Sequence, residues 1–207
     1  MIQHYGRHRI TNASIEHPIL DQMLSGVTVG ALYSDPPWGD GNMKYWVTMN
    51  KKMTGAEYAP ISYHQLLERI FELAARYVDG FVCIETGMRW GDQIARMMPE
   101  HGLHHVRKFR LQYRAGGKML DNLLLIGGTA RNHQFPLSGY DDLYEFYGAP
   151  LVERVLGLIQ PAKAVLDPCC GMGYTARAAV KHGLAFYGNE FNAKRLAKTT
   201  AFLEAHP

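Results

Sequence analysis

Short apolar runs alternate along the chain with segments in which apolar residues recur every three or four positions. Runs bounded by Gly, Pro and polar residues are typical of buried strands, and the longer spacing is typical of helices packed on one face. Ser62 can cap the clearest helix, and Gly80 ends it. The expected strands are residues 8–13, 27–34, 81–85, 106–113, 122–126, 164–167 and 184–188. The other expected helices are residues 15–25, 91–98, 174–182 and 193–204.

The alternation of strands and helices predicts an α/β fold with a doubly wound, mostly parallel sheet. Ala115-Gly116-Gly117 joins two of the expected strands, which predicts a hairpin at an edge of the sheet. Residues 39–61 contain several glycines and show no clean period, so we expect a long loop there. The chain has no repeat and no low-complexity segment, and we expect a single domain over residues 1–207.

The composition favours a compact intracellular protein. Of the 207 residues, 47% are apolar and 20% are charged, which argues against extended disorder. No apolar stretch approaches the ~20 residues that span a membrane. The first residues contain no signal-peptide core, so we expect a cytoplasmic location and no membrane partner. The three cysteines form no CxxC pair, which argues against a disulfide framework and against a metal site.

The strand expected over residues 27–34 runs directly into Asp35, Pro36, Pro37 and Trp38. The two prolines hold φ at roughly −65° and stop the strand, which leaves a stiff corner at its carboxyl end, where open α/β sheets bind ligands. This corner carries a carboxylate, free carbonyl groups and a large aromatic face. Such groups can hold an exocyclic amino group while a planar base stacks on the ring. A strand-ending turn with a packed tryptophan is the alternative interpretation.

A second motif lies at residues 164–173, where an apolar strand ends at Asp167 and a turn with Gly171 and Gly173 leads into a helix. Glycine lets the backbone approach a ligand closely at the start of a helix. Glu190 ends the next strand, 17 positions after Gly173. A carboxylate at that place can accept hydrogen bonds from ribose hydroxyls, so the unit predicts binding of a nucleoside cofactor.

Together, the DPPW motif at 35–38 and the DPCCGMG motif at 167–173 resemble the catalytic and cofactor motifs of S-adenosylmethionine-dependent amino-methyltransferases, which methylate adenine N6 or cytosine N4. In the commonest order of these enzymes the cofactor motif comes first. Here the catalytic motif precedes it by 132 positions, which resembles the circularly permuted beta class of DNA methyltransferases. Residues 148–156 are similar to the helix that precedes the cofactor strand in that class. The resemblance implies a Rossmann-like methyltransferase fold with seven strands, an antiparallel edge strand, and the two motifs on adjacent central strands.

The resemblance also implies roles for single residues. The Asp35 carboxylate and the Pro36 carbonyl would accept the two amino hydrogens of the target base, Pro37 would stiffen the corner, and Trp38 would stack on the base. The residues expected to bind S-adenosylmethionine are Asp167, Pro168, Gly171, Gly173, Thr175, Glu190 and Asn12. Asn12 stands where similar enzymes often carry an Asp near the cofactor adenine, and Cys169 stands where they usually carry Phe.

Basic side chains mark two segments for contact with nucleic acid, although the net charge of the chain is only +3. Residues 101–114 alternate basic and apolar positions, as in a strand with one wet face that contacts phosphates. An edge strand protected by charge is the alternative for this segment. For Trp46, a base-flipping wedge and ordinary packing are both open. The residues expected to contact nucleic acid are Lys44, Trp46, Lys51, Lys52, Arg107, Lys108, Arg110, Arg114 and Arg131.

The segment available for target recognition is short. A catalytic part of about residues 1–128 and a cofactor part of residues 148–207 leave only residues 129–147. An independent domain usually needs ~50 residues or more. We therefore expect low or short sequence specificity, or a homodimer or other partner that supplies the rest; a small phage-type enzyme would suit this economy.

The function expected from these motifs is methylation of adenine N6 in DNA after the base has been flipped out of the duplex. Asp35 and Trp38 favour adenine because cytosine-N4 enzymes more often begin the motif with Ser. Methylation of adenine in RNA, methylation of cytosine N4 in DNA, and an inactive cofactor-binding partner subunit stay open as alternatives. Weaker alternatives are protein glutamine methylation and a cytosine-C5 nucleophile at Pro168-Cys169.

Overall fold

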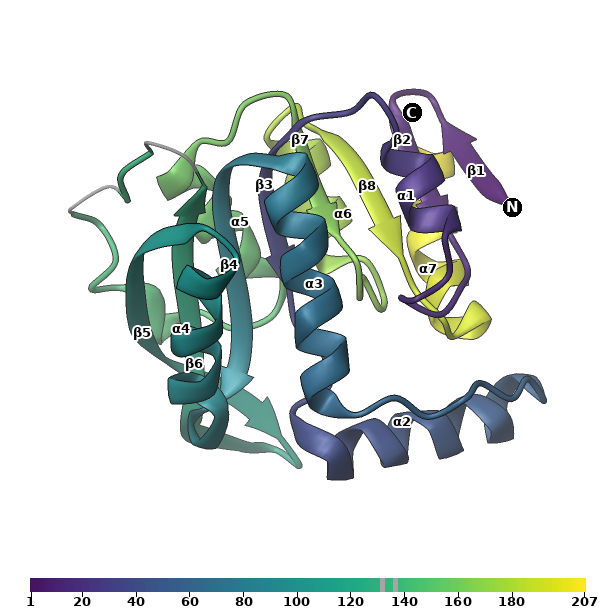
Figure 1. The fold of residues 1–207 in the computed structure, drawn as a ribbon, viewed down its shortest axis with the longest axis horizontal. Helices are drawn as coiled ribbons and strands as arrows, with labels where there is room; N and C mark the ends of the chain where they lie inside the picture. The colour runs from purple at the N-terminus through teal and green to yellow at the C-terminus, as the bar shows by residue number, and fades with distance from the viewer. Residues whose placement is uncertain (131–132, 136–137) are drawn as a thin grey trace.

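The computed structural model describes residues 1–130, 133–135 and 138–207, which form a sheet with helices on both faces (Figure 1). The strands are β1 (Ile2–Tyr5), β2 (His8–Thr11), β3 (Val29–Ser34), β4 (Val78–Gly87), β5 (Leu103–Ala115), β6 (Lys118–Ala130), β7 (Ala164–Asp167) and β8 (Ala185–Asn189). The α-helices are α1 (Ile19–Leu24), α2 (Gly39–Thr54), α3 (Tyr63–Tyr77), α4 (Gly91–Glu100), α5 (Ala149–Ile159), α6 (Tyr174–Lys181) and α7 (Ala193–Glu204). Two short 3-10 helices are η1 (Met88–Trp90) and η2 (Leu143–Glu145).

The described residues form an eight-stranded sheet in the order β1-β2-β8-β7-β3-β4-β6-β5. The strands from β2 to β4 in that order are parallel, whereas β6 is antiparallel to both of its neighbours and β1 is antiparallel to β2. The predicted α/β fold with a doubly wound, mostly parallel sheet is confirmed. The strand count differs from the expected seven because β1 is too short and too polar to show an apolar pattern.

Two apolar layers hold the helices on the sheet. Helices α1, α3 and α4 cover one face of the sheet, and α5, α6 and α7 cover the other (Figure 1). The buried side chains of each set form one of the two layers. The start of α3 is fixed by a capping box in which Ser62 and Gln65 bond to each other's backbone N–H. The cap predicted at Ser62 is therefore confirmed.

The chain leaves the central β7–β3 pair in opposite directions. From β7 it passes through α6 to β8 on one side, and from β3 it passes through α3 to β4 on the other. The carboxyl ends of β7 and β3 thus flank a topological switch point, where open α/β sheets bind their ligands. Both sequence motifs lie there, because Asp35 directly follows β3 and Asp167 ends β7.

Residues 39–54 form helix α2, so the loop expected over residues 39–61 is wrong for most of its length. Only Gly39, Met43 and Asn50 of this helix are buried. The helix therefore lacks the apolar stripe that would reveal it in the sequence. It lies across the end of the sheet below α3 (Figure 1), and Asp40 Oδ1 accepts a 2.7 Å hydrogen bond from the backbone N–H of Tyr63.

Other boundaries shift less. The helix expected over residues 15–25 is reduced to α1, and Pro99 lies within the last turn of α4 instead of ending it. The predicted hairpin is confirmed, with longer strands than expected. Gly116 and Gly117 have φ values of 56° and 80°, which suit the two-residue turns that favour glycine. None of the helices in the described part of the chain combines the length and the apolar character that a membrane span requires.

Candidate active site

The two sequence motifs lie side by side on parallel strands. In the register of β3 and β7, Leu32 pairs with Leu166, so Ser34 and Asp167 reach the carboxyl edge of the sheet together. The Ser34 hydroxyl donates a 2.9 Å hydrogen bond to Oδ1 of Asp167. The expectation that the motifs occupy adjacent central strands is therefore confirmed.

Asp167 organises the glycine turn from a buried position. Its Oδ1 also accepts the backbone N–H of Cys169 at 3.0 Å, and its Oδ2 accepts the Thr175 hydroxyl at 2.6 Å. Burial raises the pKa of the Asp167 carboxyl to about 7, against the lowering effect of these donors. Asp167 and Thr175 both border a cavity, as expected of cofactor-binding residues, but the Thr175 hydroxyl is already engaged by Asp167.

The turn at Gly171 and Gly173 brings the backbone close to two side chains of α7. Both glycines have positive φ, 53° and 86°, which favours glycine over other residues. A Cβ at Gly171 would lie 2.5 Å from the Arg195 guanidinium, and a Cβ at Gly173 would lie 2.7 Å from the Thr199 hydroxyl. The turn can therefore carry no side chain at either position without displacing its neighbours.

Glu190 follows β8 and lies against this turn. Its Oε2 accepts the backbone N–H of Gly171 at 2.9 Å, and its Oε1 accepts the backbone N–H of Asn192 at 2.8 Å. Burial raises the pKa of the Glu190 carboxyl, and the cation of Arg195 opposes that rise. Glu190 borders the same cavity as Pro168, and contact of either residue with a cofactor stays a prediction.

Asn12 lies behind this site. Its side-chain amide donates to the backbone carbonyls of Glu190 and Phe191 at 2.6 and 3.0 Å. The cavity wall is formed by the next residues, Ala13, Ser14 and Ile15. The geometry therefore gives Asn12 a part in holding the strand end, and direct contact with a cofactor stays a prediction.

The DPPW motif forms the corner that its prolines predict. Trp38 Nε1 donates a 3.0 Å hydrogen bond to Asp35 Oδ1, and the Trp38 ring meets the Tyr113 ring edge-on, with centroids 5.4 Å apart. Asp35 is open to the cavities, yet the surrounding protein raises the pKa of its carboxyl to about 6 by desolvation. The Trp38 N–H and the Arg195 cation act in the opposite direction.

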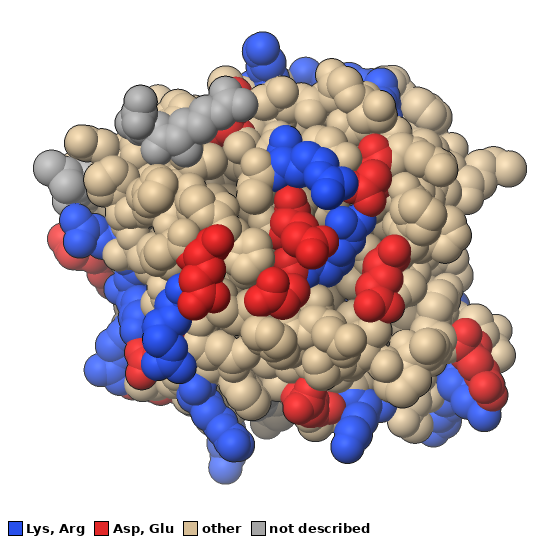
Figure 2. All heavy atoms as spheres, viewed as in Figure 1, with Lys and Arg blue, Asp and Glu red and all other residues tan. Residues whose placement is uncertain are grey.

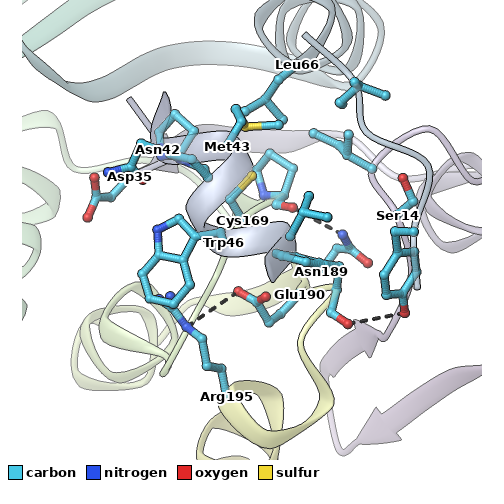
Figure 3. Close-up of a pocket in the computed structure, with 18 of the residues that line it drawn as sticks. Ser14, Asp35, Asn42, Met43, Trp46, Leu66, Cys169, Asn189, Glu190 and Arg195 are labelled. Atoms are coloured by element: carbon cyan, nitrogen blue, oxygen red, sulfur yellow. Dashed lines mark hydrogen bonds and ion pairs between the residues drawn. The ribbon is translucent and has the colours of Figure 1, made fainter. Parts of the chain in front are cut away.

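Two cavities adjoin at this corner, with volumes of about 400 and about 510 Å³. We call them the first and second cavity. The walls of both include Asp35, Trp38, Tyr113, Cys169 and Arg195. The first cavity opens toward α2 and the end of β8 (Figure 3), and its wall also includes Pro36, Pro37, Trp46, Tyr58, Pro168 and Glu190. The second cavity lies toward β4 and α5, and its wall also includes Tyr33, Glu85, Arg114, Tyr147, Asp167, Gly171 and Thr175.

Trp46 of α2 faces the first cavity, where the Arg195 guanidinium lies 4.2 Å from the centre of a ring of Trp46 (Figure 3). Such a contact is a cation–π interaction. The same guanidinium group lies between Trp46 and Glu190, with Arg195 Nε 4.0 Å from Glu190 Oε2. Trp46 therefore packs against Arg195 at the cavity wall, which agrees with the packing alternative. A role as a base-flipping wedge stays a prediction.

The predicted nucleic-acid contacts fall into two groups. On α2, Lys44, Lys51 and Lys52 are exposed, and Lys51 pairs with Glu57. On β5, Lys108 pairs with Asp92 and Arg110 pairs with Asp121. Acidic side chains lie among Lys and Arg across the face shown in Figure 2. Arg107 is exposed, Arg114 borders the second cavity, and Arg131 lies outside the described residues.

The described part of the segment expected to recognise the target packs on the protein itself. The Tyr140 ring stacks on Phe109 of β5 with centroids 4.6 Å apart, and Phe135 is buried against Phe81. Tyr147 is 40% exposed and borders the second cavity. Within the described residues of this segment, the contact with the site is made at the end next to α5.

The described residues of the cavity walls that the sequence motifs do not predict include Tyr33, Tyr58, Glu85, Tyr113 and Arg195. Glu85 stands at the end of an expected strand, which is a signal of the kind that identified Glu190. Arg195 had no such signal, because it stands on the first turn of an ordinary amphipathic helix. Among the described residues there is no cluster of side chains that could hold a metal ion.

Comparison with known proteins gives similarity in structure alone. No protein-family model and no curated protein matches the chain. The structure of M1.HpyAVI is similar with a TM-score of 0.68 and 19% identity, over 94% of this chain and 97% of that chain. TTHA0409 from Thermus thermophilus, described as a putative DNA modification methylase, is similar with a TM-score of 0.65 and 15% identity, over 96% and 95%.

A third similar structure is the PvuII DNA methyltransferase, which is cytosine-N4-specific. Its TM-score is 0.58 at 12% identity, over 94% of this chain and 85% of that chain. Structures of M1.HpyAVI and TTHA0409 in complex with S-adenosylmethionine are also similar to this chain. The likeness establishes that the chain shares the fold of these structures.

Proposed function

We propose that the protein is an S-adenosylmethionine-dependent methyltransferase that methylates the N6 amino group of adenine in DNA. The observation that carries this proposal is the meeting of the DPPW corner and the glycine turn at the switch point, with Asp35 on the wall of both cavities. One cavity can then hold a methyl donor while the other holds an acceptor, with the amino-binding corner between them. The DNA methylases among the similar structures support DNA as the substrate.

The first cavity fits S-adenosylmethionine. Its volume of about 400 Å³ is within the range of small-molecule sites. Pro37 and Tyr58 offer flat apolar walls for a purine, and the Glu190 carboxylate lies at the same wall, where its remaining lone pairs can accept from ribose hydroxyls. When bound there, S-adenosylmethionine supplies a methyl group on a sulfonium centre.

Asp35 and Pro36 would activate the acceptor. The amino nitrogen of adenine is a poor nucleophile because its lone pair is conjugated with the ring. If Asp35 Oδ2 and the Pro36 carbonyl each accept one amino hydrogen, the nitrogen can become pyramidal and direct its lone pair toward the methyl group. Orientation and fixed charge then supply most of the rate acceleration.

Trp38 has two tasks in this scheme. Its indole N–H holds Asp35 Oδ1 at 3.0 Å, which leaves Oδ2 to face the amino group. Its ring, braced edge-on by Tyr113, offers a stacking surface to the base. Stacking of a base on an aromatic side chain contributes ~1–3 kcal/mol, which offsets part of the few kcal/mol that base flipping costs.

Contacts with the DNA backbone would come from the rim of the site. Arg114 borders the second cavity, and Lys44 and Lys52 are exposed on α2, which follows the catalytic corner. Lysine and arginine at such places neutralise phosphates without reading the sequence.

Methylation of cytosine N4 is the second candidate. It is favoured by the similarity to a cytosine-N4-specific enzyme, and the proposed acceptors bind an amino group without reading the rest of the ring. Asp35 in place of the serine common in such enzymes is the reason that adenine ranks first.

Transfer of a labelled methyl group from S-adenosylmethionine to unmethylated duplex DNA tests the proposal. We expect label in the DNA with the wild-type protein and none with Asp35→Ala, while calorimetry shows the same affinity of both proteins for S-adenosylmethionine. Label in the DNA with Asp35→Ala at the wild-type rate would remove the proposed role of the corner.

A further inference from the structure

Glu85 is a carboxyl group of the second cavity that the amino-binding corner does not use. Glu85 lies near the carboxyl end of β4, which is next to β3 in the sheet, and the residue is only 6% exposed. In the register of these parallel strands Ser34 pairs with Ile84. The next residue on each strand is Asp35 on one and Glu85 on the other, so these two lie at neighbouring positions. Both side chains border the second cavity, together with the edge-on pair Trp38 and Tyr113.

The two carboxyl oxygens of Glu85 differ in their hydrogen bonding. The Tyr33 hydroxyl, which is buried, donates a 2.6 Å hydrogen bond to Glu85 Oε1. Glu85 Oε2 has no hydrogen-bond partner among the described residues, and Oε2 is not a fully enclosed atom. The carboxyl group is thus oriented by Tyr33 with one oxygen left for a ligand in the cavity.

The charges around Glu85 favour its neutral form. Burial raises the pKa of the Glu85 carboxyl well above its usual range, the neighbouring carboxylates of Asp35 and Asp167 raise it further, and the hydrogen bond from Tyr33 opposes that rise. A neutral carboxyl group that already accepts from Tyr33 at Oε1 carries its proton on Oε2. Its free side is therefore a hydrogen-bond donor, whereas Asp35 beside it is an acceptor.

This pair of groups matches one edge of two bases. Adenine and cytosine each carry an amino group, which donates, next to a ring nitrogen, which accepts: N1 in adenine and N3 in cytosine. A base whose amino group meets Asp35 presents that ring nitrogen to a neighbouring position on the cavity wall, and Glu85 occupies such a position. An ionised carboxylate there would repel the ring lone pair.

We propose that Glu85 is a specificity residue of the methyltransferase site: its Oε2 donates a hydrogen bond to the ring nitrogen beside the amino group that is methylated. The inference rests on the proposed function, and it adds that the site recognises the amino group and the adjacent acceptor as one unit. Tyr33 is the positioning residue that orients the carboxyl group.

A double-mutant cycle between protein and substrate tests this contact. The substrate is a DNA duplex with the target adenine opposite an abasic site, so that pairing does not differ between substrates. In the altered substrate 1-deazaadenine replaces the target, which exchanges N1 for C–H and keeps the amino group. The matched control substrate carries 7-deazaadenine, which keeps N1.

For the wild-type protein we expect kcat/KM to fall about three- to tenfold with 1-deazaadenine relative to adenine, as for the loss of one hydrogen bond. Glu85→Ala should be slower on adenine and should lose nothing further with 1-deazaadenine. Glu85→Gln keeps a donor and should keep most of the discrimination. Tyr33→Phe should reduce the preference for adenine over 1-deazaadenine without abolishing it.

The same fall with 1-deazaadenine in Glu85→Ala as in the wild type would overturn the contact. Equal affinity of wild type and Glu85→Ala for S-adenosylmethionine shows that the variant is folded. If the wild type transfers no methyl group to ordinary adenine, the proposed function fails instead. If it methylates cytosine, the cycle is run with 3-deazacytosine, and the same two outcomes decide.

Discussion

The Ser34 hydroxyl donates a 2.9 Å hydrogen bond to Oδ1 of Asp167, although 133 positions separate the two residues in the chain. Ser34 is the last residue before the DPPW corner, and Asp167 begins the glycine turn. The bond therefore ties the expected amino-binding motif to the expected cofactor motif at the buried edge of the sheet.

Asp35→Asn should abolish methyl transfer and leave cofactor binding intact. The amide keeps the size of the side chain but offers a weaker acceptor in place of a carboxylate. We expect kcat to fall by at least about 100-fold, consistent with the loss of one electrostatic group at a reacting centre. Single-turnover methyl transfer measures the rate, and calorimetry with S-adenosylmethionine is the control. A kcat within a few fold of wild type would contradict the acceptor role.

The rate of methyl transfer should rise with pH around 6. The pKa of the Asp35 carboxyl is raised to about 6, and only the ionised form can accept from the amino group without a competing proton. Protonation below that pKa removes the acceptor, so activity is lost as the pH falls through about 6 and is present above it. A kcat/KM profile from pH 5 to 8 checks this, and a profile that is flat across that range would contradict it.

Glu190→Gln should weaken binding of S-adenosylmethionine by about 1.5–3 kcal/mol, the usual contribution of hydrogen bonds to a charged group. Glu190 accepts the backbone N–H groups of Gly171 and Asn192 with different oxygens, and the amide keeps only one of these acceptors, so a thermal unfolding curve of the variant is the control for folding. Calorimetric titration measures the dissociation constant. An unchanged constant in a folded variant would place the ribose elsewhere.

Thr175→Ala should destabilise the fold by about 1–3 kcal/mol, because the buried Asp167 Oδ2 loses the hydroxyl that donates to it at 2.6 Å. Thr175→Ser keeps the hydroxyl and should lose less than half as much. Denaturant unfolding of the three proteins gives the comparison. Equal stability of Thr175→Ala and the wild type would show that this bond contributes little.

Arg114→Ala should weaken DNA binding more than Arg110→Ala does. Arg114 borders the second cavity, whereas Arg110 lies on the same strand and pairs with Asp121. We expect the salt dependence of binding to fall by about one phosphate contact for Arg114→Ala, a change in slope of about 0.9. Fluorescence anisotropy over a range of salt concentrations measures it, and equal effects of the two variants would contradict this assignment.

Much of the fold could be predicted because its central strands β3, β4 and β7 are buried on both faces and read as apolar runs. The β7–turn–α6–β8 unit lies within a residue of its predicted bounds, since Gly173 and Gly183 mark its helix clearly. Helix α2 could not be predicted, because its contacts with the rest of the protein involve few buried side chains. β1 was missed for a similar reason: it is a short edge strand with exposed polar residues.

Site residues could be predicted where they belong to a motif at the end of a strand. Residues that reach the site only through contacts between distant elements could not be predicted. The DPPW corner and Glu190 could be identified because their chemistry is visible in the local sequence. Arg195 borders both cavities because α7 packs beside the glycine turn, and Tyr113 meets Trp38 because the β5–β6 hairpin pairs with β4. Such contacts depend on the strand order, which local periodicity does not contain.

The most direct test of the central claim is mass spectrometry of nucleosides from duplex DNA treated with the protein and isotopically labelled S-adenosylmethionine. The account predicts labelled N6-methyladenine that is absent when Asp35→Ala replaces the wild type. Labelled N4-methylcytosine would keep the amino-binding corner and contradict the choice of adenine. DNA without any labelled nucleoside, from a protein that binds S-adenosylmethionine, would contradict the claim that this site methylates DNA.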